Sequence, residues 1–120
     1  MKHIKSILII IFIFTINITF AQLKTEEFKV EGKCEMCKNR IEKAAKSVKG
    51  IKTANWNVES KMLKITFDLK ESSAYEVEQA VAKVGHSTKY VSASKKAYNS
   101  LPSCCKYELT DAKKGCNHCN

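Results

Sequence analysis

The chain contains the stretch Gly32-Lys33-Cys34-Glu35-Met36-Cys37-Lys38-Asn39-Arg40-Ile41, in which two cysteines lie three positions apart. Before this stretch, Phe28 and Val30 alternate with polar residues, as they do in a half-buried strand. After Cys37, the apolar residues follow helical spacing, at Ile41, Ala44, Ala45 and Val48. We therefore predict that the two cysteines end a strand and begin a helix.

A helix start favours negative charge, because its unpaired backbone N–H groups and its dipole both present positive charge there. Cys34 and Cys37 should therefore ionise more readily than free thiols, and thiolates are the ligands of soft metals. Two such sulfurs can bind Cu(I) or supply half of a four-coordinate zinc site. The CxxC spacing alone leaves two other interpretations open, a structural disulfide and a redox-active pair.

The first 21 residues resemble a secretory signal peptide. Lys2 and Lys5 precede an uncharged apolar run from Ile7 to Phe14, and Thr19 and Ala21 are small residues before a cleavage site ahead of Gln22. The run is shorter than the roughly 20 apolar residues of a membrane span. We expect cleavage, no stable membrane anchor afterwards, and a periplasmic or secreted location.

The remaining chain, from residue 22, is long enough for one small domain and a tail. Loss of Lys2 and Lys5 leaves 19 basic and 12 acidic residues, a net charge near +7. The excess lysines fall mostly on the solvated side of the first predicted helix, and Arg40 is the single arginine. We therefore do not expect nucleic acid as a partner.

The pattern after the first helix predicts a hairpin, a second helix and a last strand. Apolar residues alternate through 54–58 and again through 63–67, with a polar turn at 59–61 between them. Ser73 and Glu76 form a capping-box signature, before a helical stripe that ends at Gly85. Residues 88–91 are predicted as a short final strand.

The order βαββαβ in about 70 residues predicts an α+β, ferredoxin-like sandwich, with a four-stranded antiparallel sheet and both helices on one face. The residues expected to supply most of the core share the buried positions of these patterns: Ile41, Ala45, Val48, Trp56, Val58, Leu63, Ile65, Phe67, Val77, Ala80, Val81 and Val84.

From residue 93 the composition shifts to Ser, Ala, Lys and Asn, and residues 93–120 form a cysteine-rich tail. The tail carries five candidate ligands of soft metals: Cys104, Cys105, Cys116, His118 and Cys119. A second site for zinc or copper is one interpretation, because thiolate and imidazole suit both metals. Disulfides among the six cysteines are another interpretation, and a third is that the tail lends a ligand to the site at Cys34 and Cys37.

Two features resemble the heavy-metal-associated domain, over roughly residues 24–92: the βαββαβ order and the motif Gly32-Lys33-Cys34-Glu35-Met36-Cys37. The resemblance implies that Cys34 and Cys37 bind Cu(I), or Hg(II) as in the mercury-binding members, and pass it to a partner domain by thiolate exchange. The family usually has a methionine and one more residue between the glycine and the first cysteine, where this chain has Lys33 alone. Met36 is the candidate to replace that methionine.

The resemblance also places Gly85-His86 in the loop that faces the metal, where copper carriers often have an aromatic residue. His86 is either a third metal ligand or a loop residue satisfied by backbone groups, and we favour the second interpretation.

The sequence therefore predicts a signal peptide at 1–21, a heavy-metal-associated domain at 22–92 and the tail at 93–120. The expected function is a non-enzymatic, exported carrier or scavenger of a soft metal, with Cu(I) first and Hg(II) or Zn(II) as alternatives. A metal-transport or efflux protein is the expected partner. The alternatives are a thiol-disulfide oxidoreductase that uses the same CxxC pair and a disulfide-stapled interaction module.

Overall fold

The computed structural model describes residues 20–109. The elements of this part are β1 (Leu23–Lys29), α2 (Glu35–Lys46), β2 (Ile51–Trp56), β3 (Met62–Asp68), α3 (Ala74–Lys83), α4 (Lys95–Asn99) and the 3-10 turn η1 (Ser103–Cys105). The signal peptide, predicted at 1–21, lies almost entirely outside the described residues. Within the described part, no helix has the length and apolar character needed to cross a membrane.

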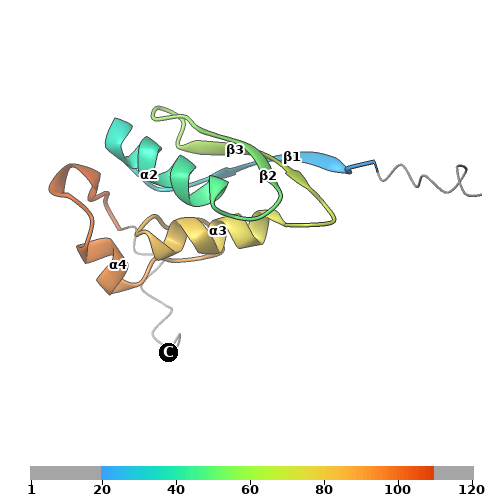
Figure 1. The fold of residues 1–120 in the computed structure, drawn as a ribbon. Helices are drawn as coiled ribbons and strands as arrows, with labels where there is room; N and C mark the ends of the chain where they lie inside the picture. The colour runs from blue at the N-terminus through green and yellow to red at the C-terminus, as the bar shows by residue number, and fades with distance from the viewer. Residues whose placement is uncertain (1–19, 110–120) are drawn as a thin grey trace, which may run out of the picture.

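The three strands form an antiparallel sheet in the order β1-β3-β2. Their alternate residues point to one face, where Trp56, Leu63, Ile65 and Phe67 are buried. The helices α2 and α3 lie against this face and complete the core with Ile41, Ala45, Val77 and Val81 (Figure 1). The ferredoxin-like α+β arrangement with two main helices is therefore confirmed.

The two helices begin where the sequence indicated. Cys34 is the residue that precedes the first turn of α2. At α3, the Glu76 carboxylate accepts a hydrogen bond from the backbone N–H of Ser73 at 2.9 Å, as the capping-box pattern predicts. Most of the predicted core residues are buried, but Val48, Val58, Ala80 and Val84 are only partly covered.

The predicted fourth strand at residues 88–91 was wrong, since the described part of the chain has a sheet of three strands. Only one isolated bridge, between Val30 and Thr88, remains where that strand would lie. The reason is a local turn: the Thr88 N–H donates to the Val91 carbonyl at 2.8 Å, and the Val91 N–H donates to the Thr88 hydroxyl at 3.1 Å. Backbone groups used in this turn cannot extend a ladder along β1.

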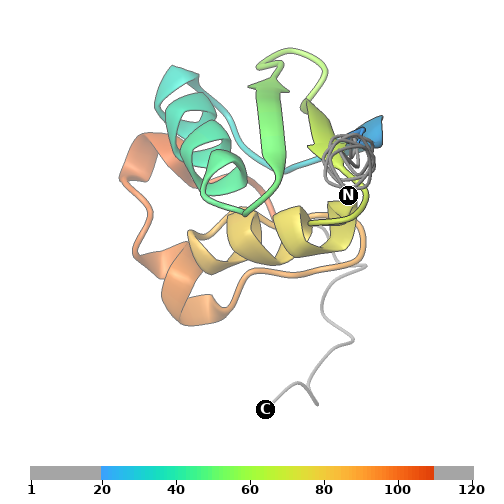
Figure 2. The same cartoon turned by 45° about the vertical axis from the view of Figure 1, so that its right-hand side comes forward.

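The chain continues to pack against the domain after residue 92, where the composition change predicted a boundary. Leu101, Cys105 and Tyr107 are buried in the same core cluster as Trp56 and Ile41. Figure 2 shows α4 beside the end of α3, and the segment after α4 running back to α2. We call residues 95–107 the C-terminal segment; it belongs physically to the folded unit.

Candidate metal centre

The CxxC pair lies at the start of α2, with the two thiols turned toward each other. Cys34 is half-buried and precedes the helix, Cys37 is buried in its first turn, and the two Sγ atoms are 3.4 Å apart. The backbone N–H of Lys33 donates to the Cys37 Sγ at 3.4 Å. The helix start therefore holds both sulfurs and supplies N–H groups toward them.

The loop before the cysteines rests on Trp56. A Cβ atom added at Gly32 would lie 3.0 Å from the indole ring and 3.1 Å from the Cys37 Cβ, so a larger residue would require the indole ring or Cys37 to shift by a few tenths of an ångström. The indole Nε1 donates to the backbone carbonyls of Val30 and Lys61, both at 3.1 Å. Trp56 therefore fills the space under the loop, whereas Met36, the expected filler, is 48% exposed.

The two thiols are not equivalent in their surroundings, because Cys34 is half-buried and Cys37 is fully buried. Burial would raise the pKa of Cys34, but hydrogen bonds from the backbone of Cys37, from the thiols of Cys37 and Cys105 and from the backbone of Met36 lower it to about 7. A large fraction of Cys34 is therefore thiolate near neutral pH, which is the form that binds a soft metal.

Two tail cysteines lie at the same place. The Sγ atoms of Cys34 and Cys105 are 3.8 Å apart, and those of Cys104 and Cys105 are 4.0 Å apart. The sulfurs of Cys34, Cys104 and Cys105 all lie within 4.8 Å of one another. The structure thus brings Cys104 and Cys105 to the CxxC pair, and none of these four cysteines is in a disulfide.

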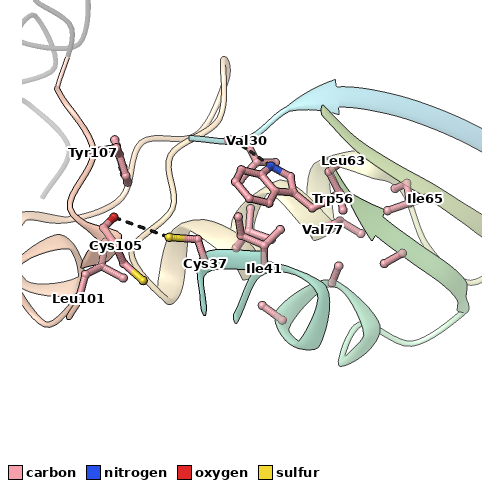
Figure 3. Packing of buried hydrophobic residues seen from close by; sticks show 14 of the residues in the cluster. Val30, Cys37, Ile41, Trp56, Leu63, Ile65, Val77, Leu101, Cys105 and Tyr107 are labelled. Atoms are coloured by element: carbon pink, nitrogen blue, oxygen red, sulfur yellow. Dashed lines mark hydrogen bonds between the residues drawn. The ribbon is translucent and has the colours of Figure 1, made fainter. Parts of the chain in front are cut away.

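Cys105 is held inside the protein. Figure 3 shows the Cys37 side chain directed at the Cys105 carbonyl oxygen, with a sulfur–oxygen distance of 4.0 Å. Burial raises the pKa of the Cys105 thiol, and so do the hydrogen bonds it shares with Cys37 and Cys34. Without a metal, Cys105 is therefore a neutral thiol beside the Cys34 thiolate.

Tyr107 fixes the C-terminal segment over the site. Its buried hydroxyl donates to the Gly85 carbonyl at 2.8 Å and accepts from the Ser87 N–H at 2.9 Å. The Tyr98 ring packs edge-on against the Tyr107 ring, at 5.1 Å between centroids. Sequence reasoning missed this residue, because an aromatic residue two positions after Cys105 was the only signal for it.

A thioether extends the group of sulfurs. The Cys104 thiol donates to the Met36 Sδ at 3.8 Å, so Met36 faces the C-terminal segment. Cys104 and Met36 are both exposed, whereas Cys37 and Cys105 are buried. The sulfurs therefore extend from the surface to the interior.

His86 is fully buried. Its Nδ1 donates to the Glu31 carbonyl at 2.8 Å, so in the neutral ring Nε2 carries no proton, and this atom has no hydrogen-bond partner in residues 20–109. Burial lowers the pKa of His86 and the charge of Arg40 lowers it further, against the opposing Glu31 bond. His86 is not among the side chains that converge within 4.8 Å, and the backbone interpretation fits this geometry.

The other candidate ligands in the tail are Cys116, His118 and Cys119, and all three lie outside the described residues. A second site built from them stays a prediction.

The fold and the thiol group together define a small α+β domain whose donor set, four thiols and a thioether, suits a soft metal ion. Residues 27–90, slightly more than half of the chain, match the family described as the heavy-metal-associated domain. The chain therefore belongs to this family, as the resemblance implied.

Solved structures of similar fold include copper proteins. The N-terminal domain of a potential copper-translocating P-type ATPase from Bacillus subtilis, solved in the Cu(I)-loaded state, is 32% identical and covers 57% of this chain and 86% of its own, with a TM-score of 0.53. The N-terminal soluble domains of CopA from the same organism are 26% identical and cover 57% and 48%, with a TM-score of 0.54.

The CopZ metallochaperone shares the fold, at 24% identity over 54% of this chain and 98% of its own, with a TM-score of 0.53. A comparison with curated proteins finds no match.

Proposed function

We propose that this protein is an exported, non-enzymatic carrier or scavenger of a soft metal ion, with Cu(I) as its cargo. Cys34 and Cys37 are the ligands that capture the ion. The observation that carries the proposal is the pair of thiols 3.4 Å apart at the start of α2.

The chemistry of the pair supports Cu(I) first. A thiolate is the preferred donor of Cu(I), and the two sulfurs are already positioned, so little order has to be imposed when the ion binds. The 32% identical P-type ATPase domain solved with Cu(I) is consistent with the same cargo. Hg(II) and Zn(II) also accept thiolates and are the competing cargoes to test.

The signal-peptide pattern of residues 1–21 supports export to the periplasm or the outside of the cell. A carrier releases its ion to another protein, so a metal-transport or efflux protein is the partner we propose. The charge near +7 of the mature chain would favour a docking surface that is acidic.

The test is a Cu(I) titration of the reduced chain from residue 22, in competition with the chromophoric chelator bathocuproine disulfonate. We expect one Cu(I) bound tightly at the paired cysteines. The variant C34S/C37S should lose this binding, whereas C116S/C119S, which removes the same number of thiols, should keep it. Trp56 fluorescence checks that each variant is folded. Unchanged affinity and stoichiometry in C34S/C37S would overturn the proposal.

A further inference from the structure

Four thiols that are far apart in the sequence form one continuous group. Cys34 links the two halves of the group, because its sulfur is 3.4 Å from that of Cys37 and 3.8 Å from that of Cys105. Cys104 adjoins Cys105 at 4.0 Å. The family match ends at residue 90, so the second half of the group comes from outside the matched domain.

The C-terminal segment is positioned by packing. Leu101 and Tyr107, on either side of the two cysteines, are 4% exposed each. Gly85 makes room for the segment: a Cβ atom there would lie 2.8 Å from the Ala97 carbonyl oxygen and 2.9 Å from Leu101. Both ends of the Cys104–Cys105 turn are therefore fixed on the domain, and the thiols are held in place before any metal arrives.

The spacing of the sulfurs indicates how many of them one ion can contact. With metal–sulfur bonds of about 2.3 Å, two sulfurs opposite each other across an ion are about 4.6 Å apart, and three sulfurs around it are about 4.0 Å apart. The observed separations are 3.4, 3.8 and 4.0 Å. They are nearer to the separation of three sulfurs around one ion than to that of two, and the sulfurs of Cys34, Cys104 and Cys105 all lie within 4.8 Å of one another.

We propose that Cys104 and Cys105 are further ligands of the ion captured by Cys34 and Cys37, so that at least three thiolates hold one soft ion. Each thiol that binds releases its proton to solvent as the metal–sulfur bond forms, and no electron transfer is involved. This inference rests on the proposed capture of Cu(I) by the CxxC pair.

The consequence concerns release of the ion. A partner takes an ion from a two-thiolate site by adding its own thiolate to the open position of the metal. Here Cys105 and Cys104 would occupy that position, so the incoming thiolate must displace one of them first. Retention of the ion, the behaviour of a scavenger, follows from the added ligands.

The test compares three double variants of the reduced chain from residue 22. X-ray absorption at the copper edge counts the sulfur neighbours of bound Cu(I), and chelator competition measures affinity. We expect three or more sulfurs in the unchanged protein and in C116S/C119S. C104S/C105S should still bind one Cu(I), now through two sulfurs. Its affinity for Cu(I) should fall by a factor of about ten or more.

Two sulfurs around Cu(I) in the unchanged protein would overturn the inference, and this measurement involves no variant that could unfold. Loss of the additional sulfurs in C116S/C119S would overturn it as well. If C104S/C105S does not fold, the exposed single variant C104S and the sulfur count of the unchanged protein decide. Binding that persists in C34S/C37S would instead refute the proposed function, so the two failures are distinguishable.

Discussion

The Tyr107 hydroxyl donates a hydrogen bond of 2.8 Å to the Gly85 carbonyl oxygen and so joins the C-terminal segment to the loop after α3. The same hydroxyl is 3.1 Å from the Ser87 hydroxyl and accepts from the Ser87 N–H. The Tyr107 side chain therefore satisfies three polar groups at the edge of the core. Burial raises the pKa of its hydroxyl.

The first prediction concerns this hydroxyl. Tyr107→Phe should lower the free energy of unfolding by about 1–3 kcal/mol, because buried partners at Gly85 and Ser87 lose their hydrogen bonds. Urea unfolding followed by Trp56 fluorescence measures the change. Tyr90→Phe is the matched control, since Tyr90 is 72% exposed, and it should change stability little. Equal effects of the two substitutions would contradict the role given to Tyr107.

The second prediction concerns the extent of the folded unit. The predicted boundary at 92 implies that a chain cut after Val91 stays folded, but this cut removes Leu101, Cys105 and Tyr107 from the core. We expect a loss of several kcal/mol, as for other deletions of buried side chains. A chain cut after Leu109 keeps these residues and is the control. If both truncated chains have the same urea midpoint, the C-terminal segment contributes nothing to stability.

The third prediction concerns the pH dependence of thiol reactivity. Because the thiolate is the nucleophile and the pKa of Cys34 is about 7, its alkylation by iodoacetamide should rise with pH and level off above pH 7. Cys105, buried and with a raised pKa, should be the slower of the two. Mass spectrometry of peptides from the metal-free protein gives each rate. An alkylation rate of Cys34 that still rises steeply at pH 9 would contradict a pKa of about 7 for this thiol.

The fourth prediction concerns His86. Its pKa is lowered in the folded protein, so the unfolded chain binds the proton more readily below pH 6.5 or so. Stability should therefore fall as the pH drops below about 6.5, the unfolded value. In His86→Gln the fall between pH 7 and pH 5.5 should be smaller, because the titrating group is gone. If the free energy of unfolding changes with pH in the same way in both proteins, His86 does not contribute to the pH dependence of stability.

The fifth prediction separates a carrier from an oxidoreductase. Cys37, the second thiol of the pair, is buried and is directed at the Cys105 carbonyl, so a substrate disulfide has restricted access to it. We expect slow reduction of insulin compared with a dedicated thioredoxin. Turnover at a thioredoxin-like rate that is abolished by Cys34→Ser would favour the oxidoreductase alternative.

Local patterns predicted most of the fold, because each depends on residues close in sequence. The alternation at 63–67 and the Ser73–Glu76 cap are both found in the structure. The prediction of a fourth strand was wrong because Thr88 and Val91 form hydrogen bonds with each other in a local turn. β propensity does not reveal such a turn. The pattern of residues 88–91 gave no sign of that turn.

The site was predictable in part. The spacing of Cys34 and Cys37 predicted their position at a helix start, which is a local property. The approach of Cys105 spans 71 positions and depends on the packing of Leu101 and Tyr107. Neither residue belongs to a periodic pattern, so the sequence left the tail cysteines open between a second metal site, disulfides and a ligand for the first site.

The absence of a fourth strand leaves one side of β1 without a neighbouring strand in the described part of the chain. An open strand edge can pair with another chain and start aggregation. The residues of β1 oppose this, because charged side chains recur along it at Lys24, Glu26, Glu27 and Lys29. Pairing with a second copy along this edge would require these charged side chains to lose water. The charges of β1 therefore make this edge a poor template for self-association.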